Sequence, residues 1–390
     1  MRPAWKALAL AAAAALAIIG CGGDASTTGK ASDLRTRLDL LLGENLLLSA
    51  KTTSAVLGDR VEESHAYMAM LDRNGADVAA TMAAASPASV KARLERIWLA
   101  YDRLVIAYAN GAAALDDSGQ AGAAGWLTGQ FAPQLSAVMA GPTGLSRPAI
   151  ERLASQLVAQ VKQLVDDQAA GRWTAVFSDV RSTSRQGQAM GDAIAQGIVK
   201  KRPDLFPGDV SARAVGFRES LELLLQEHMY LVTMTSSAAL DGSGGEYEAD
   251  VALLYQNGQD LGDVIGTAFG TSAQRTFEQI WNAYIHSIAI YESGVVAPSP
   301  SRRAKALRDL TQHYVPRFAG FVASLTGLPS SSIAGPARES VLRATAVVNA
   351  QGAARWGKAA AGDRAAAQHM QAIGDPLAAA VVARHPGKFA

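Results

Sequence analysis

The chain repeats itself at a fixed offset of 183 residues, and no other feature constrains its fold as strongly. At this offset Trp98 aligns with Trp281, and the register holds from residue 38 to the end. The other coincidences include Tyr101 with Tyr284, Asn74-Gly75 with Asn257-Gly258, Trp173 with Trp356, and Gly191-Asp192 with Gly374-Asp375. Self-similarity at a constant period indicates a repeated structural unit. We therefore predict a tandem duplication, with copies over residues 33–206 and 207–390.

Each copy is expected to form about six helices. Alanine, leucine and glutamine are abundant and runs of β-branched residues are scarce, which favours helices. In the first copy the expected helices cover residues 33–57, 60–85, 88–117, 119–141, 147–169 and 172–202. Pro133 and Pro316 fall inside expected helices, so a kink or break is predicted at each. The predicted fold is all-α, with two tandem homologous helical-bundle domains that each have a four-helix core.

The first helix of each copy is rich in leucine but carries polar residues in its middle. Residues 38–48 read LDLLLGENLLL, and residues 221–231 read LELLLQEHMYL. Helical spacing places His228 along the apolar stripe of its helix and Glu227 at the edge of that stripe. The last helix of the second copy has a similar stripe, which contains His369.

Both histidines are replaced in the first copy. The aligned residues there are Asn45 and Gln186, so two imidazoles are exchanged for two amides together. A paired exchange of this kind indicates two groups that face each other and interact. With Glu44, the two amides could form a buried hydrogen-bond network, in which an unpaired group would cost about 1–3 kcal/mol. Glu227, His228 and His369 of the second copy could form a hydrogen-bond network of the same kind.

The alternative is a metal site in the second copy. His228 and His369 would supply imidazoles, and Glu227 would supply a carboxylate. Met370 or Met229 could add a thioether. Helix bundles build metal sites from side chains on facing helices. Imidazole with thioether suits copper, whereas imidazole with carboxylate suits zinc, so copper or zinc is the cofactor that this alternative implies.

Other repeated residues are interpreted as structural. Asn74 and Asp77 lie one helical turn apart and are expected to bond to neighbouring helices. Gly191 is expected to allow close helix packing, and Asp192 to form a hydrogen bond between helices. Trp98 is expected to anchor the core because of its size.

The motifs of the second copy resemble those of a known group of helical repeats. They are Glu227-His228, Asn257-Gly258-Gln259-Asp260, His369-Met370 and Gly374-Asp375. The pattern is similar to repeats in exported Gram-positive proteins that are labelled copper amine oxidase-like. It departs from them at Trp281-Asn282-Ala283-Tyr284, where tyrosine replaces the histidine of a Trp-x-x-His element. The resemblance covers nearly all of the mature chain and implies an exported helical protein, with no match to the catalytic amine oxidase.

The first twenty residues are typical of a bacterial signal peptide. A short basic segment is followed by the apolar stretch ALALAAAAALAIIG, which is too short and alanine-rich for a good membrane-spanning helix. The sequence Ile18-Ile19-Gly20-Cys21 resembles the lipobox of bacterial lipoproteins. That resemblance implies cleavage before Cys21 and lipid on its sulfur, which would anchor the protein at the extracytoplasmic face of the cell membrane. Cleavage elsewhere would leave a free thiol or remove it. Residues 21–32 are predicted to form a flexible tether.

Composition narrows the possible partners. The chain has 36 basic and 35 acidic residues and no basic stripe with aromatic residues, so nucleic acid is not an expected partner. No G-x-S-x-G, phosphate-loop or Cys/His nucleophile motif nominates an enzyme. We therefore predict a non-catalytic binding or interaction role at the cell envelope, with a cleft between the copies for a ligand or an envelope protein. Metal binding by the second copy is the alternative.

Overall fold

The computed structural model describes residues 26–389, and this range is helical without a strand. The predicted all-α class is confirmed. Within residues 26–389 no helix combines the length and the apolar character needed to cross a membrane. The predicted signal peptide, residues 1–20, and Cys21 lie outside the described residues.

The helices of the two halves begin at equivalent positions. The first half consists of α1 (Lys30–Leu57), α2 (Val61–Met82), α3 (Ala88–Ala113), α4 (Asp117–Trp126), the π-helical turn η1 (Leu127–Phe131), α5 (Ala132–Thr143), α6 (Arg147–Ala169) and α7 (Trp173–Lys201). The second half consists of α8 (Arg213–Asp241), α9 (Gly244–Phe269), α10 (Thr271–Val296), α11 (Pro300–Arg308), the π-helical turn η2 (Asp309–Tyr314), α12 (Val315–Thr326), α13 (Ser330–Gly352), α14 (Trp356–His369), α15 (Gln371–Arg384) and α16 (Pro386–Phe389). Each helix from α1 to α7 starts 183 residues before a helix of the second half.

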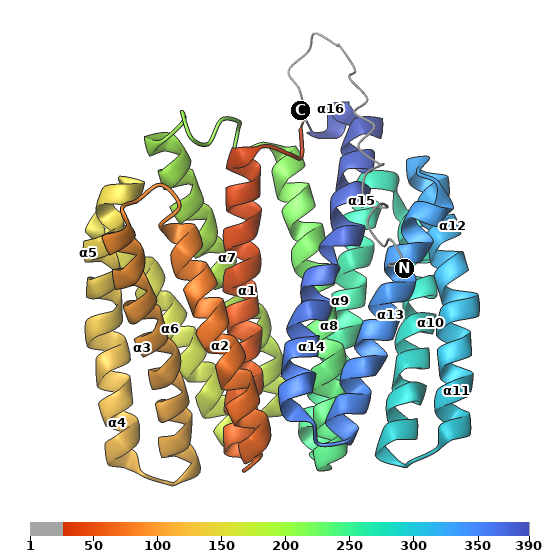
Figure 1. The fold of residues 1–390 in the computed structure, drawn as a ribbon, viewed down its shortest axis with the longest axis horizontal. Coiled ribbons are helices and arrows are strands. Elements are labelled where there is room, and N and C mark those ends of the chain that lie inside the picture. Colours follow the sequence, from red (N-terminus) through yellow and green to blue (C-terminus); the bar gives the residue numbers. More distant parts are fainter. Residues whose placement is uncertain (1–25, 390) are drawn as a thin grey trace, which may run out of the picture.

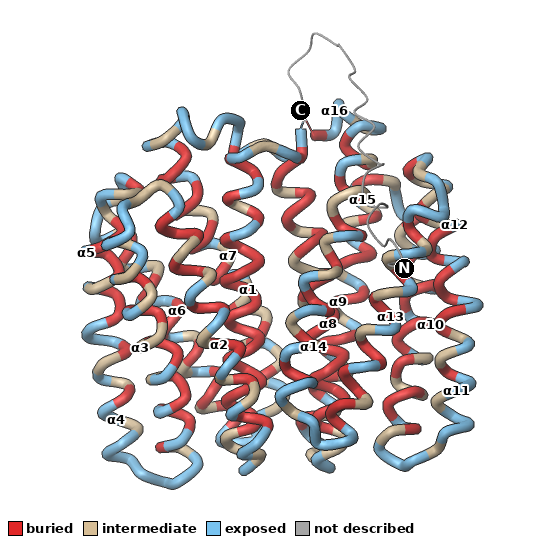
Figure 2. Tube along the Cα trace, viewed as in Figure 1, coloured by how far each residue is buried: buried red, intermediate tan, exposed pale blue. Residues whose placement is uncertain are grey.

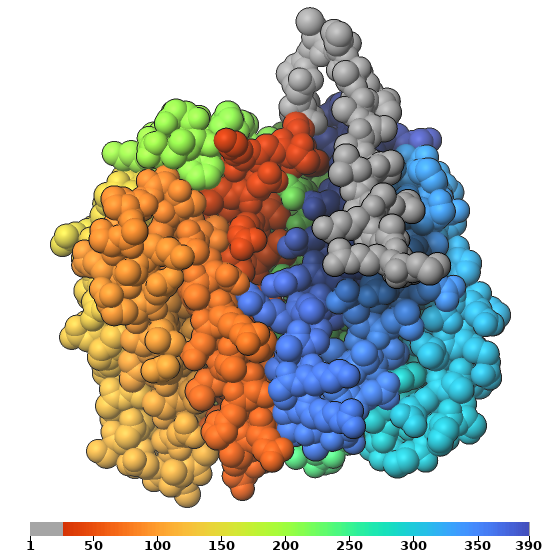
Figure 3. Space-filling model, in the orientation of Figure 1, coloured from red at the N-terminus to blue at the C-terminus, as the bar shows by residue number. Residues whose placement is uncertain are grey.

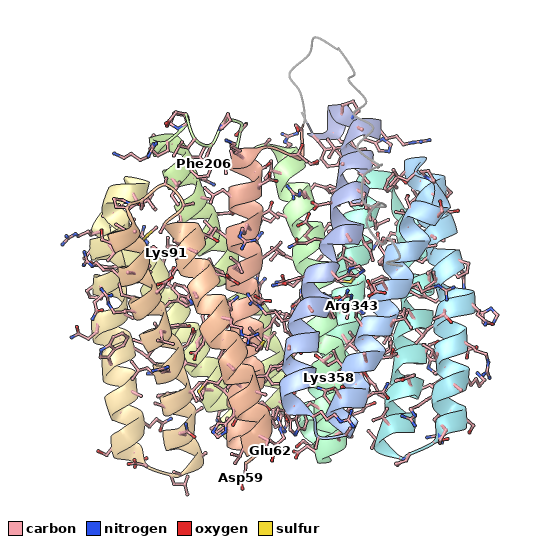
Figure 4. The ribbon with its side chains drawn as sticks, viewed as in Figure 1. Asp59, Glu62, Lys91, Phe206, Arg343 and Lys358 are labelled. Carbon is pink, nitrogen blue, oxygen red and sulfur yellow. The ribbon has the colours of Figure 1, made fainter. Side chains whose placement is uncertain are left out.

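The helices run up and down between two ends of the molecule. Phe206 marks one end, whereas Asp59 and Glu62 mark the other (Figure 4). The first half occupies one side of the view and the second half the other, with α1, α2, α8 and α14 near the middle (Figure 1). On the surface the two halves meet along a boundary between the chain segments coloured orange and blue (Figure 3).

α1 is a central helix that is buried on nearly all sides (Figure 2). It packs against α2, α3, α6 and α7 of its own half and against α8 across the interface. It has no polar face, and a helix of this kind is stable only inside a protein. Thr52 and Thr53 donate hydrogen bonds to the carbonyls of Leu48 and Ser49, at 2.6 and 2.9 Å, so their hydroxyls are satisfied within the helix. A central helix thus organises the packing of each half. The sequence had predicted a four-helix core.

The apolar core is continuous across the two halves. One cluster of buried side chains contains Leu48 and Tyr67 of the first half together with Tyr230 and Leu231 of the second. The helix-free segment 202–212, which joins α7 to α8, contains the predicted copy boundary.

The fourth helix expected in each copy is divided. Residues 119–141 comprise α4, η1 and α5, so each half has more than six helical elements. The division lies at the prolines, because Pro133 and Pro316 occupy the first turns of α5 and α12. Proline has no N–H for the preceding turn, and a π-helical turn before each proline accommodates this loss. A kink or break was predicted at each proline, and the structure has a π-helical turn there within a continuous run of helical residues.

The predicted tether is wrong from Thr27 onward. Thr27 is buried, and its carbonyl accepts a hydrogen bond of 3.1 Å from Arg218 of α8. α1 already begins at Lys30, and the amide of Ala31 donates to the carbonyl of Pro207 at 3.4 Å. Small residues are typical of linkers, but their size also allows the chain to pack closely against the start of α8.

Candidate functional site

The Gly-Asp motif of α7 is a packing device. A Cβ atom at Gly191 would collide with the carboxylate of Asp39, and Asp192 accepts a hydrogen bond from Arg35. The second half repeats this arrangement with Gly374, Glu222, Asp375 and Arg218. The structural interpretation of this motif is confirmed.

Three carboxylates converge beside this motif. Asp39, Asp192 and Glu219 offer oxygens within 4.8 Å of one another. Arg35 already pairs with Glu219 at 2.8 Å and with Asp192, so its guanidinium supplies the positive charge of the cluster. Burial, together with the charge of Glu219, raises the pKa of Asp39 well above its ordinary value.

The Asn-x-x-Asp motif of α2 holds the two halves together. Asn74 donates hydrogen bonds to the carbonyl of Leu41 and to Glu44, at 2.9 and 2.8 Å. Arg364 reaches across from α14, donates to Glu44 at 3.0 Å and pairs with Asp77 at 2.6 Å. An arginine of the second half therefore binds two acidic residues of the first.

We call this pairing of an Asn-x-x-Asp motif with an arginine of the other half a brace. A second brace lies on the other face of the interface, where the first half supplies the arginine. Asn257 of α9 donates to the carbonyl of Leu224 and to Glu227, at 2.9 Å each. Arg181 reaches across from α7 and pairs with Asp260 at 2.7 Å. The expectation that these asparagines bond to neighbouring helices is confirmed, and each half donates one arginine to the other.

The two braces differ in two hydrogen bonds. Arg364 donates to Glu44 as well as to Asp77, whereas within residues 26–389 Arg181 pairs with Asp260 alone. The hydroxyl of Tyr230 donates to Oε1 of Glu44 at 2.9 Å. The residue that aligns with Tyr230 is Leu47, which has no donor. Oε1 of Glu227 consequently has no hydrogen-bond partner among the described residues, whereas its Oε2 is held by Asn257.

A cavity opens on the side that lacks this hydroxyl. It has a volume of about 320 Å³, within the range of small-molecule sites, and lies between α1, α7, α8 and α9. Its lining includes Leu47, Arg185, Leu224, Glu227, Asp260 and Val264. Both halves therefore contribute to it. Gly43 and the aligned Gln226 both line the cavity, and the Gln226 side chain donates to the carbonyl of Leu40 at 2.8 Å.

The cavity contains the carboxyl group of Glu227, and its surroundings shift the pKa of this group. Burial raises the pKa of Glu227 above its ordinary value, and the hydrogen bond from Asn257 opposes that shift. Arg185, which is exposed, forms no ion pair among residues 26–389. The cavity thus presents one free carboxyl oxygen and one free guanidinium beside apolar walls.

The predicted pair of facing histidines is wrong. Nδ1 of His228 lies 3.2 Å from Oδ1 of Asn257, and Nε2 of His369 lies 3.2 Å from the carbonyl oxygen of Pro336. Gln186 likewise donates to a carbonyl of its neighbouring helix, that of Leu153, at 3.1 Å. Each histidine therefore bonds to a helix of its own half and not to the other histidine.

The true partner of Asn45 is Asp102. Nδ2 of Asn45 donates to Oδ1 of Asp102 at 3.0 Å, and burial raises the pKa of Asp102 well above its ordinary value. The residue that aligns with Asp102 is Ile285, so Asn45 and Asp102 are exchanged together for His228 and Ile285. The aligned copies contain this exchange of Asp102 for Ile285. It was missed because the sequence analysis followed the histidines, and neither of these residues is one.

His228 is enclosed by aromatic rings. Its ring centre lies 4.7 Å from that of Trp281 and 5.2 Å from that of Tyr284. Burial lowers the pKa of His228 to about 3, so the imidazole is neutral. Its Nε2 has no hydrogen-bond partner in the described part of the chain.

The predicted metal ligands separate into two places. Glu227, His228 and His369 do not form a three-ligand cluster in the range that the structure describes. Glu227 lines the cavity between the halves. His228, Met229 and Met370 line a second, internal cavity, which has room for about one water molecule.

No protein-family model, curated protein or solved structure matches this chain. Its function is therefore inferred from the chemistry of its own side chains. The cavity between the halves and the small cavity beside His228 are the two places that supply such chemistry.

The reciprocal braces should differ in strength. Replacing Arg364 by alanine leaves Glu44, which is 1% exposed, without its counter-charge, and should lower the free energy of unfolding by about 3 kcal/mol. Arg181→Ala is the matched control, since Arg181 and Asp260 are 29% and 23% exposed, and should cost about 1 kcal/mol or less. Urea unfolding of both variants measures the difference, and equal losses would contradict this assignment.

Proposed function

We propose that this protein is a non-catalytic extracytoplasmic binding protein that holds a small ligand between its two halves. In this proposal lipid on Cys21 anchors the chain to the outer side of the cell membrane. The observation that carries the proposal is the cavity between the halves, where apolar walls adjoin a free carboxyl oxygen and a free guanidinium. Small-molecule sites combine an apolar lining with a few polar groups that orient the ligand.

The asymmetry of the interface supports a ligand more than simple packing. The two faces descend from aligned residues, yet one is filled by Tyr230 whereas the other has Leu47 at the aligned position. An interface that served only to join the halves would gain stability from filling both faces, because cavities weaken packing. An envelope protein as partner would instead use the outer surface.

Filling the cavity should abolish ligand retention. The double variant Gly43→Gln/Leu47→Tyr places larger side chains at two residues that line the cavity, and Leu47→Tyr copies Tyr230 of the filled face. Its side chains should occupy the cavity without disturbing the braces. Native mass spectrometry after incubation with a small-molecule extract of the cell envelope should detect a ligand on the unmodified chain and none on this variant. Leu342→Tyr, at an exposed leucine of α13, is the matched control and should retain the ligand. The same bound compounds in all three proteins would refute the proposal.

The anchor is tested by Cys21→Ser. In the proposal the lipid on this residue is the attachment to the membrane. The variant should move from the membrane fraction to the soluble fraction of lysed cells, and metabolic labelling with a fatty acid should disappear. Retention of the variant in the membrane fraction would argue against lipid anchoring.

A second candidate is the binding of a soft metal ion in the second half. It is favoured by one observation: the unpartnered Nε2 of His228 and the thioethers of Met229 and Met370 share a buried cavity. Imidazole and thioether together suit copper, especially as Cu(I). Zinc is not favoured, because Glu227 and His369 do not line this cavity.

This candidate is tested by competition with a chromophoric Cu(I) chelator. His228→Asn, which copies Asn45 of the first half, should weaken Cu(I) binding at least about tenfold through loss of the imidazole ligand. His369→Asn is the control and should leave the affinity unchanged. Equal affinities for the unmodified protein and both variants would exclude a site at His228.

A further inference from the structure

The filled face of the interface shows what the cavity lacks. There the ring of Tyr230 is fully buried between the halves, and its hydroxyl donates to Oε1 of Glu44 at 2.9 Å. Asn74 and Arg364 occupy Oε2 of the same carboxylate, at 2.8 and 3.0 Å. Both carboxylate oxygens of Glu44 therefore have hydrogen-bond partners.

The cavity face repeats part of this arrangement without the phenol. Asn257 occupies Oε2 of Glu227 at 2.9 Å, as Asn74 does for Glu44. Arg181 aligns with Arg364 but pairs with Asp260 alone in the part of the chain that the structure describes. Leu47 replaces the tyrosine, so the outer ring carbons and the hydroxyl are missing. What remains is a carboxyl group with a free oxygen in a cavity whose wall includes Leu47, Leu224 and Val264.

We infer that the ligand is a phenol, whose ring fills the space that Tyr230 fills on the opposite face and whose hydroxyl donates to Oε1 of Glu227. This inference rests on the proposed binding function and names the class of ligand. A phenol supplies both missing parts, since its ring replaces buried apolar surface and its hydroxyl supplies the missing donor. An apolar ring alone would displace water from this oxygen without offering it a donor, which is unfavourable.

The direct test uses p-cresol, which is the side chain of tyrosine as a free molecule, and toluene, which lacks the hydroxyl. Both are titrated into the purified full chain and followed by ligand-observed NMR. The unmodified protein should bind p-cresol at least about tenfold more tightly than toluene, because a hydrogen bond to a charged group contributes about 1.5–3 kcal/mol. This comparison needs no variant.

Two variants locate the hydroxyl. Glu227→Leu should remove the preference for p-cresol over toluene. Tyr230→Phe is the matched control, because it removes the corresponding hydroxyl from Glu44 on the other face and should leave the preference intact. Leu47→Tyr should prevent the binding of both probes, and it serves if Glu227→Leu does not fold.

Equal affinities for p-cresol and toluene, or a preference that persists in Glu227→Leu, would overturn the phenol inference. Either result leaves the proposed function standing if the Gly43→Gln/Leu47→Tyr variant still loses its envelope ligand. If that variant keeps the ligand, the proposed function fails whatever the probes show. A p-cresol preference that depends on Glu227 and is blocked by Leu47→Tyr supports the inference.

Discussion

Two central helices without a polar face, α1 and α8, pack against each other, and their burial governs the rest of the molecule. Glu44 lies in α1 with 1% of its surface exposed, where an unpaired carboxylate would be costly. Its partners come from three other helices: Asn74, Tyr230 and Arg364. Satisfying one buried residue therefore fixes the positions of α2, α8 and α14 together.

A second buried charge shows how far the two faces have diverged. Nζ of Lys51 lies 2.6 Å from Asp363 and 2.7 Å from Thr233, and Tyr67 donates to the same aspartate at 3.0 Å. The residues that align with Lys51 and Asp363 are Met234 and Val180, so this ion pair exists once in the molecule. The arginine–aspartate pairs between the halves follow the repeat, whereas the Lys51–Asp363 pair does not.

The repeat predicted the helices well because equivalent residues face equivalent solvent and core. Helical periodicity likewise placed His228 and Asn45 inside. It did not identify their partners, because periodicity tells which side of a helix a residue lies on and not which neighbour lies opposite. The partner of Asn45 was visible only as the exchange of Asp102 for Ile285. A cleft between the copies was predicted, but its lining was not, since Leu47 is an ordinary residue of an apolar helix until Tyr230 is seen at the aligned position on the opposite face.

The reciprocal exchange of arginines has a consequence for how the chain unfolds. Arg364 of the second half covers Glu44 of the first, and Arg181 of the first half covers Asp260 of the second. If either half opened alone, it would withdraw its arginine and expose the partner's apolar face to water. The two halves therefore depend on each other to stay folded. We expect the chain to unfold as one cooperative unit, although its sequence contains two copies of the repeat.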